Sequence, residues 1–453
     1  MAKQKKTEER KQQFSPLKFV FSLVLAACFY LLDVPLSYEA RAAMIITVFI
    51  GSLWLTEALP LFVTALFVPL LLVSFKVTSS SAAFYPFFSP TIALFLGGFI
   101  IARAMQKHGL DEYIASKFTG RFGKDPRFFL LGIMATTAFL SVWISNTAST
   151  ALMLPIAVYV LVKSRLKPLK SNYAKALILG VAFAATIGGI ATLTGTPPNG
   201  IVVADLAEHG INISYLEWIY YGLPFVLLFL PIAWAVIIAV YPPEIKKLKF
   251  SMKKVRLNQT HKKVVLIASL TMLLWLTSFA HGIPDSVIAM VPIILLFASD
   301  VLVREDLLKI DWPTLLLFGG GLSLGAAIDS TGLAAYLGTI LSGLIVGQAY
   351  FVLLLMVIAF AVLMTLSASN TATAALLVPV IIALSSTLNL DVKTFAILAG
   401  IGTSLDFLVP VGTPPSAIAY GSGYVSVKDM LKVGVFLTLA GILLLAFLAW
   451  LYW

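Results

Sequence analysis

The chain has 453 residues, a formal net charge of +11, a hydrophobic fraction of 60% and a mean hydropathy of +0.97. A soluble globular protein is only about half apolar, so this composition excludes an ordinary soluble domain. Apolar runs of about twenty residues recur along nearly the whole chain, and each could cross a hydrocarbon core of about 30 Å as a helix. Barrel strands would be shorter and would alternate in polarity. The predicted fold class is therefore an all-α polytopic membrane protein.

The N-terminal 16 residues are polar and basic, and we expect them to form a cytoplasmic tail. The apolar run over 17–36 is too long for a signal-peptide core and has no clear small-residue cleavage site. It is therefore predicted to be retained as an extra first span. This run contains the single cysteine of the chain, Cys28, so no disulfide can form within the chain.

About eleven spans are predicted in chain order. They cover 17–36, 42–58, 60–75, 89–107, 173–208, 219–241, 264–280, 285–300, 312–345, 394–422 and 429–452.

Two further apolar stretches, 127–163 and 348–386, contain the related motifs SNTAST and SNTATA. The first stretch has five basic residues on each side, so both of its ends are predicted to be cytoplasmic. Roughly 10–13 residues of each arm would lie in the hydrocarbon, which corresponds to ~15–20 Å, or about half of its depth. Each stretch is therefore predicted to be a re-entrant hairpin with its motif near the middle of the membrane.

This topology places 28 of the 32 Lys and Arg residues on the cytoplasmic side, including those of a basic linker over 242–263. The N-terminus is then cytoplasmic and the C-terminus lies outside, in what we expect to be the cell membrane. Contact with anionic membrane lipid accounts for the positive charge, so nucleic acid is not an expected partner.

Two parts of the chain, 42–241 and 264–453, resemble each other in sequence. Three pairs of segments match in the same order: those beginning at Ser89 and Trp312, the two SNT motifs, and TGTPPNG from Thr194 against VGTPPSA. Each part contains five predicted crossings, an odd number, so the second copy should be inverted relative to the first. Inverted repeats with interrupted helices are typical of secondary transporters.

Both GTPP motifs are expected to interrupt a span, because two prolines lack N–H donors and the preceding glycine relaxes the backbone. Irregular backbone at membrane depth is tolerated only inside protein or beside a water-filled cavity. Freed carbonyls with Ser, Thr and Asn oxygens suit a cation such as Na⁺, and N–H groups that open a half-helix suit a carboxylate. A single Ser-Asn-Thr is more often a cap or an interhelical contact. Two such motifs and two breaks, paired by a repeat, favour a binding site.

With these motifs the sequence resembles the divalent anion/sodium symporter family over essentially its whole length. The resemblance implies a homodimer whose transport domain moves against a scaffold domain as an elevator. It implies that the substrate-binding residues are Ser145, Asn146, Thr147, Thr196, Pro197, Ser369, Asn370, Thr371, Thr413 and Pro414. It implies that the Na⁺ ligands are Ser141, Ser145, Asn146 and Gly195 at one site and Thr365, Ala368, Asn370 and Gly412 at another.

Two residues near the second break, Asp406 and Ser416, depart from the family pattern. An acidic residue within a span is a functional candidate, and Asp406 is a candidate coupling acid that would alter the second cation site, for example as a proton acceptor. The alternative is that Asp406 lies near water or is simply hydrogen-bonded. The departure leaves Na⁺ symport and dicarboxylate exchange both open.

Other polar and aromatic residues near span ends have simpler interpretations. Arg103 is expected to extend to the cytoplasmic interface, and Asp329 to be solvated. The four histidines lie in predicted loops or at span ends and are assigned no role. Four tryptophans are expected to be interface anchors, namely Trp218, Trp312, Trp450 and Trp453.

The predicted function is secondary active transport of C4–C5 dicarboxylates such as succinate, malate, fumarate or 2-oxoglutarate. Sulfate and tricarboxylates such as citrate are alternative substrates, and an anion channel is an alternative function. No enzyme is expected, because the sequence has no H-E-x-x-H motif and no ligand-spaced cluster of acids and histidines. No cofactor is expected besides Na⁺ as a coupling ion.

Overall fold

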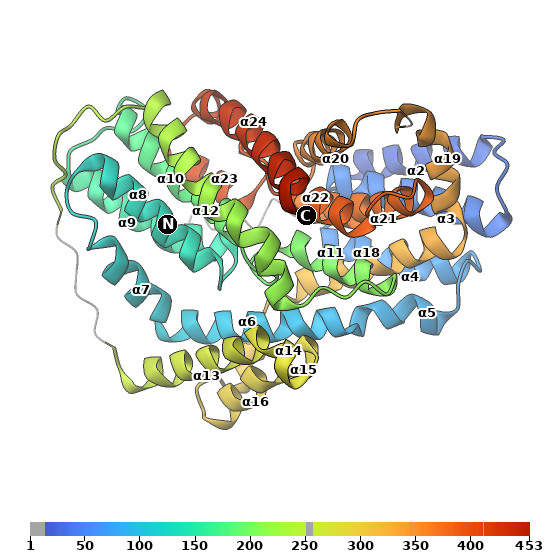
Figure 1. Cartoon of the computed structure of the whole chain (residues 1–453), viewed down its shortest axis with the longest axis horizontal. Helices are drawn as coiled ribbons and strands as arrows, with labels where there is room; N and C mark the ends of the chain where they lie inside the picture. The colour runs from blue at the N-terminus through green and yellow to red at the C-terminus, as the bar shows by residue number, and fades with distance from the viewer. Residues whose placement is uncertain (1–13, 251–256, 346, 411) are drawn as a thin grey trace.

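The structure, a computed structural model, describes residues 14–250, 257–345, 347–410 and 412–453. Every regular element in these ranges is a helix (Figure 1), which confirms the predicted all-α fold. Residues 1–13 of the predicted tail and 251–256 of the predicted linker lie outside the described part of the chain.

The first helices gather at one end of the molecule's long axis (Figure 1). They are α2 (Pro16–Leu31), α3 (Tyr38–Thr56) and α4 (Leu61–Ser74), and a short α5 (Ser80–Phe84) and a 3₁₀ helix η2 (Tyr85–Phe88) follow. The next helix, α6 (Pro90–His108), ends at Gly109, whose φ of 69° is left-handed and favours glycine. The chain continues from this glycine into α7 (Leu110–Thr119).

The first predicted hairpin, 127–163, is occupied by α8 (Pro126–Ser141) and α9 (Asn146–Lys163), which contact each other. Side-chain caps start both helices: Asp125 accepts the N–H of Arg127, and Ser145 accepts the N–H of Ala148. The two arms and the bend between them therefore follow from local sequence signals.

The predicted span 173–208 is split into α10 (Asn172–Gly189) and α11 (Pro197–Glu208), and α12 (Tyr215–Val240) follows. The break between α10 and α11 falls at the GTPP motif, where the prolines open the second half-helix. A Cβ added to Gly188 would stand 2.4 Å from the carbonyl oxygen of Ala138. The backbones of α8 and α10 are therefore in close contact, as small residues allow in membrane helices.

Four helices form a group that contacts α6 through α13, α15 and α16 (Figure 1). They are α13 (Gln259–Leu276), α14 (Ser278–His281), α15 (Asp285–Ile288) and α16 (Met290–Ala298), and a single turn, α17 (Arg304–Leu307), follows.

The predicted span 312–345 is not one straight helix. It consists of α18 (Trp312–Ser330) and α19 (Leu333–Ile345), and α18 meets the part of α19 up to Ile340 at 75°. The bend is at Gly332, whose φ of 79° is left-handed. Hydropathy misses it because the polar stretch Asp329–Thr331 before the glycine is short and lies between two long apolar segments.

The second predicted hairpin, 348–386, is occupied by α20 (Tyr350–Thr365) and α21 (Asn370–Thr387). Its Ser369 caps α21 by accepting the N–H of Ala372, as Ser145 does in α9. The predicted span 394–422 is again split at GTPP, into α22 (Val392–Thr403) and α23 (Pro414–Gly421), and α24 (Val427–Tyr452) completes the chain.

The two copies share one pattern of helix contacts. Helix α10 packs against both arms of the first hairpin, and α22 packs against both arms of the second. Beyond the breaks the partners cross over, because α11 contacts α21 and α23 contacts α9. Each hairpin therefore contacts a half-helix from the other copy.

Seven helices in the described ranges are long and apolar enough to cross a membrane, or eight if the bent pair α18–α19 is one span. The expected number is about eleven. Two of the seven, α9 and α21, are arms of the predicted hairpins. Five predicted spans are not among the seven or the bent pair: α2, α4, Asp285–Ala298 and α22 are shorter apolar helices of 10–17 residues, and α13 is not counted. The number of crossings therefore stays a prediction.

Trp218 is not an interface anchor, so that prediction is wrong. Its side chain is fully buried, and its Nε1 donates to the carbonyl oxygen of Ile190 at 3.1 Å. Ile190 lies in the break after α10, where backbone carbonyls lose their intrahelical partners, and the indole satisfies this one. By contrast, Trp312 and Trp450 are exposed.

The two charged side chains expected to meet water, Arg103 and Asp329, instead have protein partners. Arg103 Nη2 and Lys107 Nζ lie 2.8 Å and 2.6 Å from the carboxylate oxygens of Asp306, which is buried in α17. Burial alone would raise the pKa of Asp306, but hydrogen bonds from Lys107, the Val303 N–H and Arg103 hold it well below its ordinary value. Asp329 pairs with His209, a residue that was assigned no role.

Candidate functional site

The bend of the first hairpin places two acceptor oxygens within hydrogen-bond distance of the Ser141 hydroxyl. Ser141 Oγ lies 2.6 Å from Asn146 Oδ1 and 2.7 Å from the carbonyl oxygen of Ala185 in α10. A hydroxyl has a single proton, so it can donate to only one of these two acceptors at a time. A group of oxygens with too few protons is a suitable environment for a cation.

The first break closes against the same bend. Asn146 Nδ2 donates to Thr196 Oγ1 at 3.5 Å, and a Cβ added to Gly189 would stand 2.3 Å from Asn146 Oδ1. Gly195 also packs closely here, because a Cβ added to it would stand 2.4 Å from the carbonyl oxygen of Gly189. The predicted first cation set of Ser141, Asn146 and Gly195 is thus brought together. Ser145 caps the helix beside it.

Asn199, which sequence reasoning did not single out, stabilises the unwound segment of the first break. Its Nδ2 donates to the carbonyl oxygens of Gly189 at 3.0 Å and Thr192 at 2.7 Å. Its Oδ1 is buried and has no hydrogen-bond partner. The sequence signal for this role is the position of Asn199 directly after the two prolines of the first GTPP motif.

The bend of the second hairpin repeats the first. Thr365 Oγ1 donates to Asn370 Oδ1 at 2.8 Å, the counterpart of the contact between Ser141 and Asn146. Ala368, in the bend between them, is buried. The predicted second set of Thr365, Ala368 and Asn370 therefore lies in one bend.

The second break differs from the first at two positions. Ser416 occupies the place of Asn199, and its Oγ accepts a hydrogen bond from Thr413 Oγ1 at 2.9 Å instead of reaching the break carbonyls. Asp406 occupies the place of Gly189 and is fully buried beside Gly412. Both departures noted in the sequence therefore lie in the second break and face other residues of that break.

The N-termini of α9 and α21 offer the donors that an anion needs. The first N–H groups of a helix have no intrahelical acceptor, and here they belong to Asn146 and Thr147 in α9 and to Asn370 and Thr371 in α21. Pro197 and Pro414 begin α11 and α23, and proline has no N–H. The hairpin arms, rather than the half-helices after the breaks, are therefore the better anion-binding ends.

The bends and breaks contain little formal charge. The segments 141–147, 188–199, 365–371 and 404–416 contain no Lys, Arg or His, and Asp406 is their single acid. Thr147 is exposed, and Asn146, Asn370 and Thr371 are partly exposed, so these polar groups are accessible. Only N–H groups, side-chain amides, hydroxyls and bound cations could neutralise an anion here.

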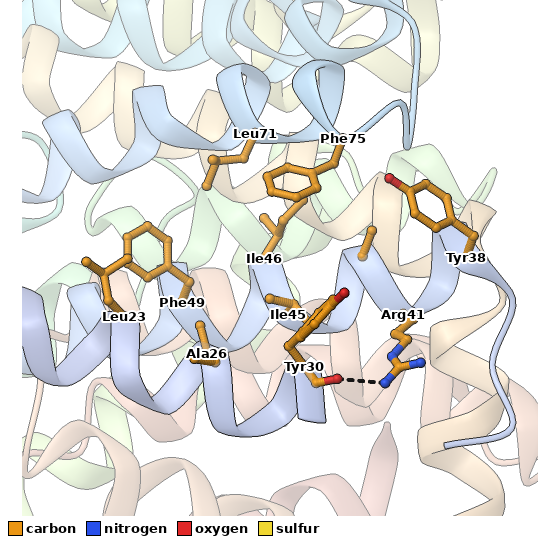
Figure 2. A pocket seen from close by; sticks show the side chains of 12 residues that line it. Leu23, Ala26, Tyr30, Tyr38, Arg41, Ile45, Ile46, Phe49, Leu71 and Phe75 are labelled. Atoms are coloured by element: carbon orange, nitrogen blue, oxygen red, sulfur yellow. Dashed lines mark hydrogen bonds between the residues drawn. The ribbon is translucent and has the colours of Figure 1, made fainter. Parts of the chain in front are cut away.

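Two cavities elsewhere in the described chain do not fit a dianion. One of about 780 Å³ lies between α6, α11, α12 and α15, and Glu208, Glu217 and Asp285 line it. These acids would repel a dicarboxylate. The other, of about 500 Å³, lies between α2, α3 and α4 and is lined almost entirely by apolar side chains, with Arg41 at one end (Figure 2). The Arg41 guanidinium already donates to the carbonyl oxygens of Tyr30 and Leu32.

A family model described as the sodium:sulfate symporter transmembrane region matches residues 13–453. The chain belongs to this family. The match confirms the resemblance to the divalent anion/sodium symporters and makes the chain an integral membrane transporter by descent. The motif residues described above are thus part of a transporter fold.

Relatives in this family match along almost the whole chain. An uncharacterized transporter of Haemophilus influenzae is 34% identical over 96% of this chain and 96% of its own length. The sodium-dependent dicarboxylate transporter SdcS of Staphylococcus saprophyticus is 32% identical over 95% of this chain and 88% of its own length.

Two solved transporter structures have a similar fold. The YdaH transporter of Alcanivorax borkumensis has a TM-score of 0.61 at 12% identity, over 84% of this chain and 89% of that one. MtrF of Neisseria gonorrhoeae has a TM-score of 0.58 at 12% identity, over 94% of this chain and 98% of that one. At such low identity the likeness concerns the fold alone.

Proposed function

We propose that the chain is a secondary active transporter of C4–C5 dicarboxylates and that the tips of its two hairpins bind the substrate. The observation that carries this is the pair of capped helix N-termini, α9 and α21, each presenting a Ser-Asn-Thr sequence with no basic side chain in the bends. Two separated partial positive charges suit an anion with a carboxylate at each end.

Reversible binding also favours this kind of site. A transporter must release its substrate on the far side of the membrane, and a lysine or arginine would hold a dianion more tightly than oriented N–H groups and hydroxyls. The name of the SdcS relative, a sodium-dependent dicarboxylate transporter, supports the same substrate class. The family description names sulfate, so sulfate is the second candidate substrate.

Na⁺ is the proposed coupling ion, and the residues present fit it. At each bend a hydroxyl and an Asn oxygen come together, and at the first bend the Ala185 carbonyl joins them and Gly189 packs against the Asn oxygen. Oxygen ligands of this kind suit a hard cation, and Ser141, Asn146 and Gly195, or Thr365, Asn370 and Gly412, would hold it. A bound Na⁺ would supply positive charge next to the substrate carboxylates.

Alternating access is proposed to be an elevator movement in a homodimer. The moving part would comprise α8–α12 and α20–α24, which contact one another through the crossed pairs α11–α21 and α9–α23. The scaffold would comprise α2–α6 and α13–α18. We place the protein in the cell membrane, with the N-terminus in the cytoplasm and the C-terminus outside.

Counterflow in liposomes tests the proposed function. Purified protein is reconstituted with internal succinate, and the uptake of labelled succinate is measured with and without an inward Na⁺ gradient. Uptake that rises with the Na⁺ gradient would support symport. Uptake that needs internal dicarboxylate but ignores Na⁺ would mean exchange. No uptake of succinate together with uptake of sulfate would contradict the dicarboxylate assignment.

A further inference from the structure

Asp406 is a buried carboxylate without a countercharge. Its side chain is fully buried, and among the described ion pairs none involves it. Oδ1 accepts a long hydrogen bond of 3.4 Å from the Leu408 N–H, and Oδ2 has no hydrogen-bond partner. A buried, unpaired carboxylate is costly, so this group must either carry a proton or have a partner of opposite charge.

The repeat indicates where this carboxylate points. Thr194 pairs with Val411, an offset of 217 residues, so Asp406 is the counterpart of Gly189. In the first copy a side chain at Gly189 would be directed at Asn146 Oδ1. In the second copy the counterpart of Asn146 is Asn370, a member of the second cation set.

Contact with Gly412 locates the carboxylate independently of the repeat. A Cβ added to Gly412 would stand 1.3 Å from Asp406 Oδ2, so the carboxylate fills the space that a side chain at 412 would need. Gly412 is itself a member of the second cation set. The unpartnered oxygen thus lies against a glycine that the family resemblance assigns to the second cation site.

We propose that the Asp406 carboxylate is an anionic ligand of the second cation site and that this site binds Na⁺ through a charged oxygen that the first site lacks. The inference rests on the proposed function, since it adds a ligand to one of the two proposed cation sites. Ligand charge sets the affinity of oxygen sites for cations, so the two sites should differ in Na⁺ affinity. The second site should be the tighter one.

The test is Na⁺ binding rather than transport. Full-length protein in detergent is titrated with NaCl at constant ionic strength, with choline as the replacement, and the melting temperature and bound ²²Na⁺ are followed. Asp406→Asn should raise the half-saturating Na⁺ concentration of the tighter site by about tenfold or more. Asp406→Glu should retain most of the affinity, and Glu305→Gln, which neutralises an exposed acid, should bind like the wild type.

An Asp406→Asn protein that binds Na⁺ within twofold of the wild type would overturn the proposal. If Asp406→Asn does not fold, Asp406→Gly, which introduces the residue of the first copy, provides the same comparison. Stabilisation by succinate is measured in parallel. If Asp406→Asn leaves Na⁺ binding unchanged and succinate still stabilises the protein, only this inference is refuted. If succinate does not bind the wild type at any Na⁺ concentration, the proposed function is contradicted.

Discussion

His209 Nε2 lies 2.7 Å from Asp329 Oδ2, and this contact joins the residue that follows α11 to the last turn of α18. In the proposed elevator, α11 belongs to the moving part and α18 to the scaffold. Among the ion pairs of the described residues, this is the pair that connects the two parts. His209 lies just outside the predicted span 173–208, so its side chain can exchange protons with water.

The stability of this contact should depend on pH. The hydrogen bond to Asp329 raises the pKa of His209 to about 9, although burial opposes the rise. Because the folded-state pKa lies above the ordinary value of 6.5, the stabilisation is complete below about pH 6.5 and is lost as the pH rises through about 9. Melting temperatures between pH 6 and pH 10 should fall over this window in the wild type. Asp329→Asn should flatten that fall, and an equal fall in the variant would refute this assignment.

The two motif asparagines should be essential for transport. Asn146→Ala and Asn370→Ala each remove an oxygen from a bend and a side chain from a helix N-terminus, so uptake should drop at least about tenfold. The control is Asn172→Ala, because Asn172 is also the first residue of a serine-capped helix but is exposed outside the motifs. Uptake by either motif variant at the wild-type rate, with equal expression, would count against the site.

Gly189 should not tolerate even a methyl group. Gly189→Ala would place Cβ 2.3 Å from Asn146 Oδ1, so either the asparagine or α10 must move. We expect a loss of about 1–3 kcal/mol in stability and a marked loss of uptake. Gly421→Ala is the control, since a Cβ there meets nothing within 4 Å. Equal effects of the two substitutions on melting temperature and uptake would contradict the close packing at Gly189.

Asp306 should stabilise the end of α6 through its two basic partners. Asp306→Asn leaves Arg103 and Lys107 without a countercharge, so the free energy of unfolding should fall by about 1–3 kcal/mol. Since the pKa of Asp306 is held below its ordinary value of 3.8, its contribution is present above that pH and is lost as the solution is acidified further. Glu305→Gln, an exposed neighbour, should have little effect. Equal melting temperatures for all three proteins would argue against the ion-pair contribution.

The parts of the fold that depend on local sequence could be predicted. The SNT motifs were expected at the bends of two hairpins and the paired prolines at breaks in two spans, and α9, α21, α11 and α23 begin at these motifs. The all-α class followed from hydropathy alone. These signals act over one or two helical turns, so a single sequence contains them.

Contacts between distant parts of the chain could not be predicted. Arg103 and Asp306 are 203 residues apart, and nothing in either local sequence identifies the partner. Trp218 was misplaced because distance from a span end does not say which face of the helix it occupies. The internal repeat is an exception among these long-range relationships. It makes Asp406 the counterpart of Gly189, so the surroundings of Gly189 in the first copy indicate those of Asp406 in the second.

Substrate protection of the hairpin tips tests the central proposal most directly. In a Cys28→Ser background, Thr147→Cys and Thr371→Cys are labelled with a membrane-impermeant maleimide in proteoliposomes that are opened to both sides. We expect saturating succinate with Na⁺ to slow labelling at both positions, while acetate does not. Labelling rates that are unchanged by succinate at both tips, in proteins that still transport it, would contradict a substrate site between the two hairpins.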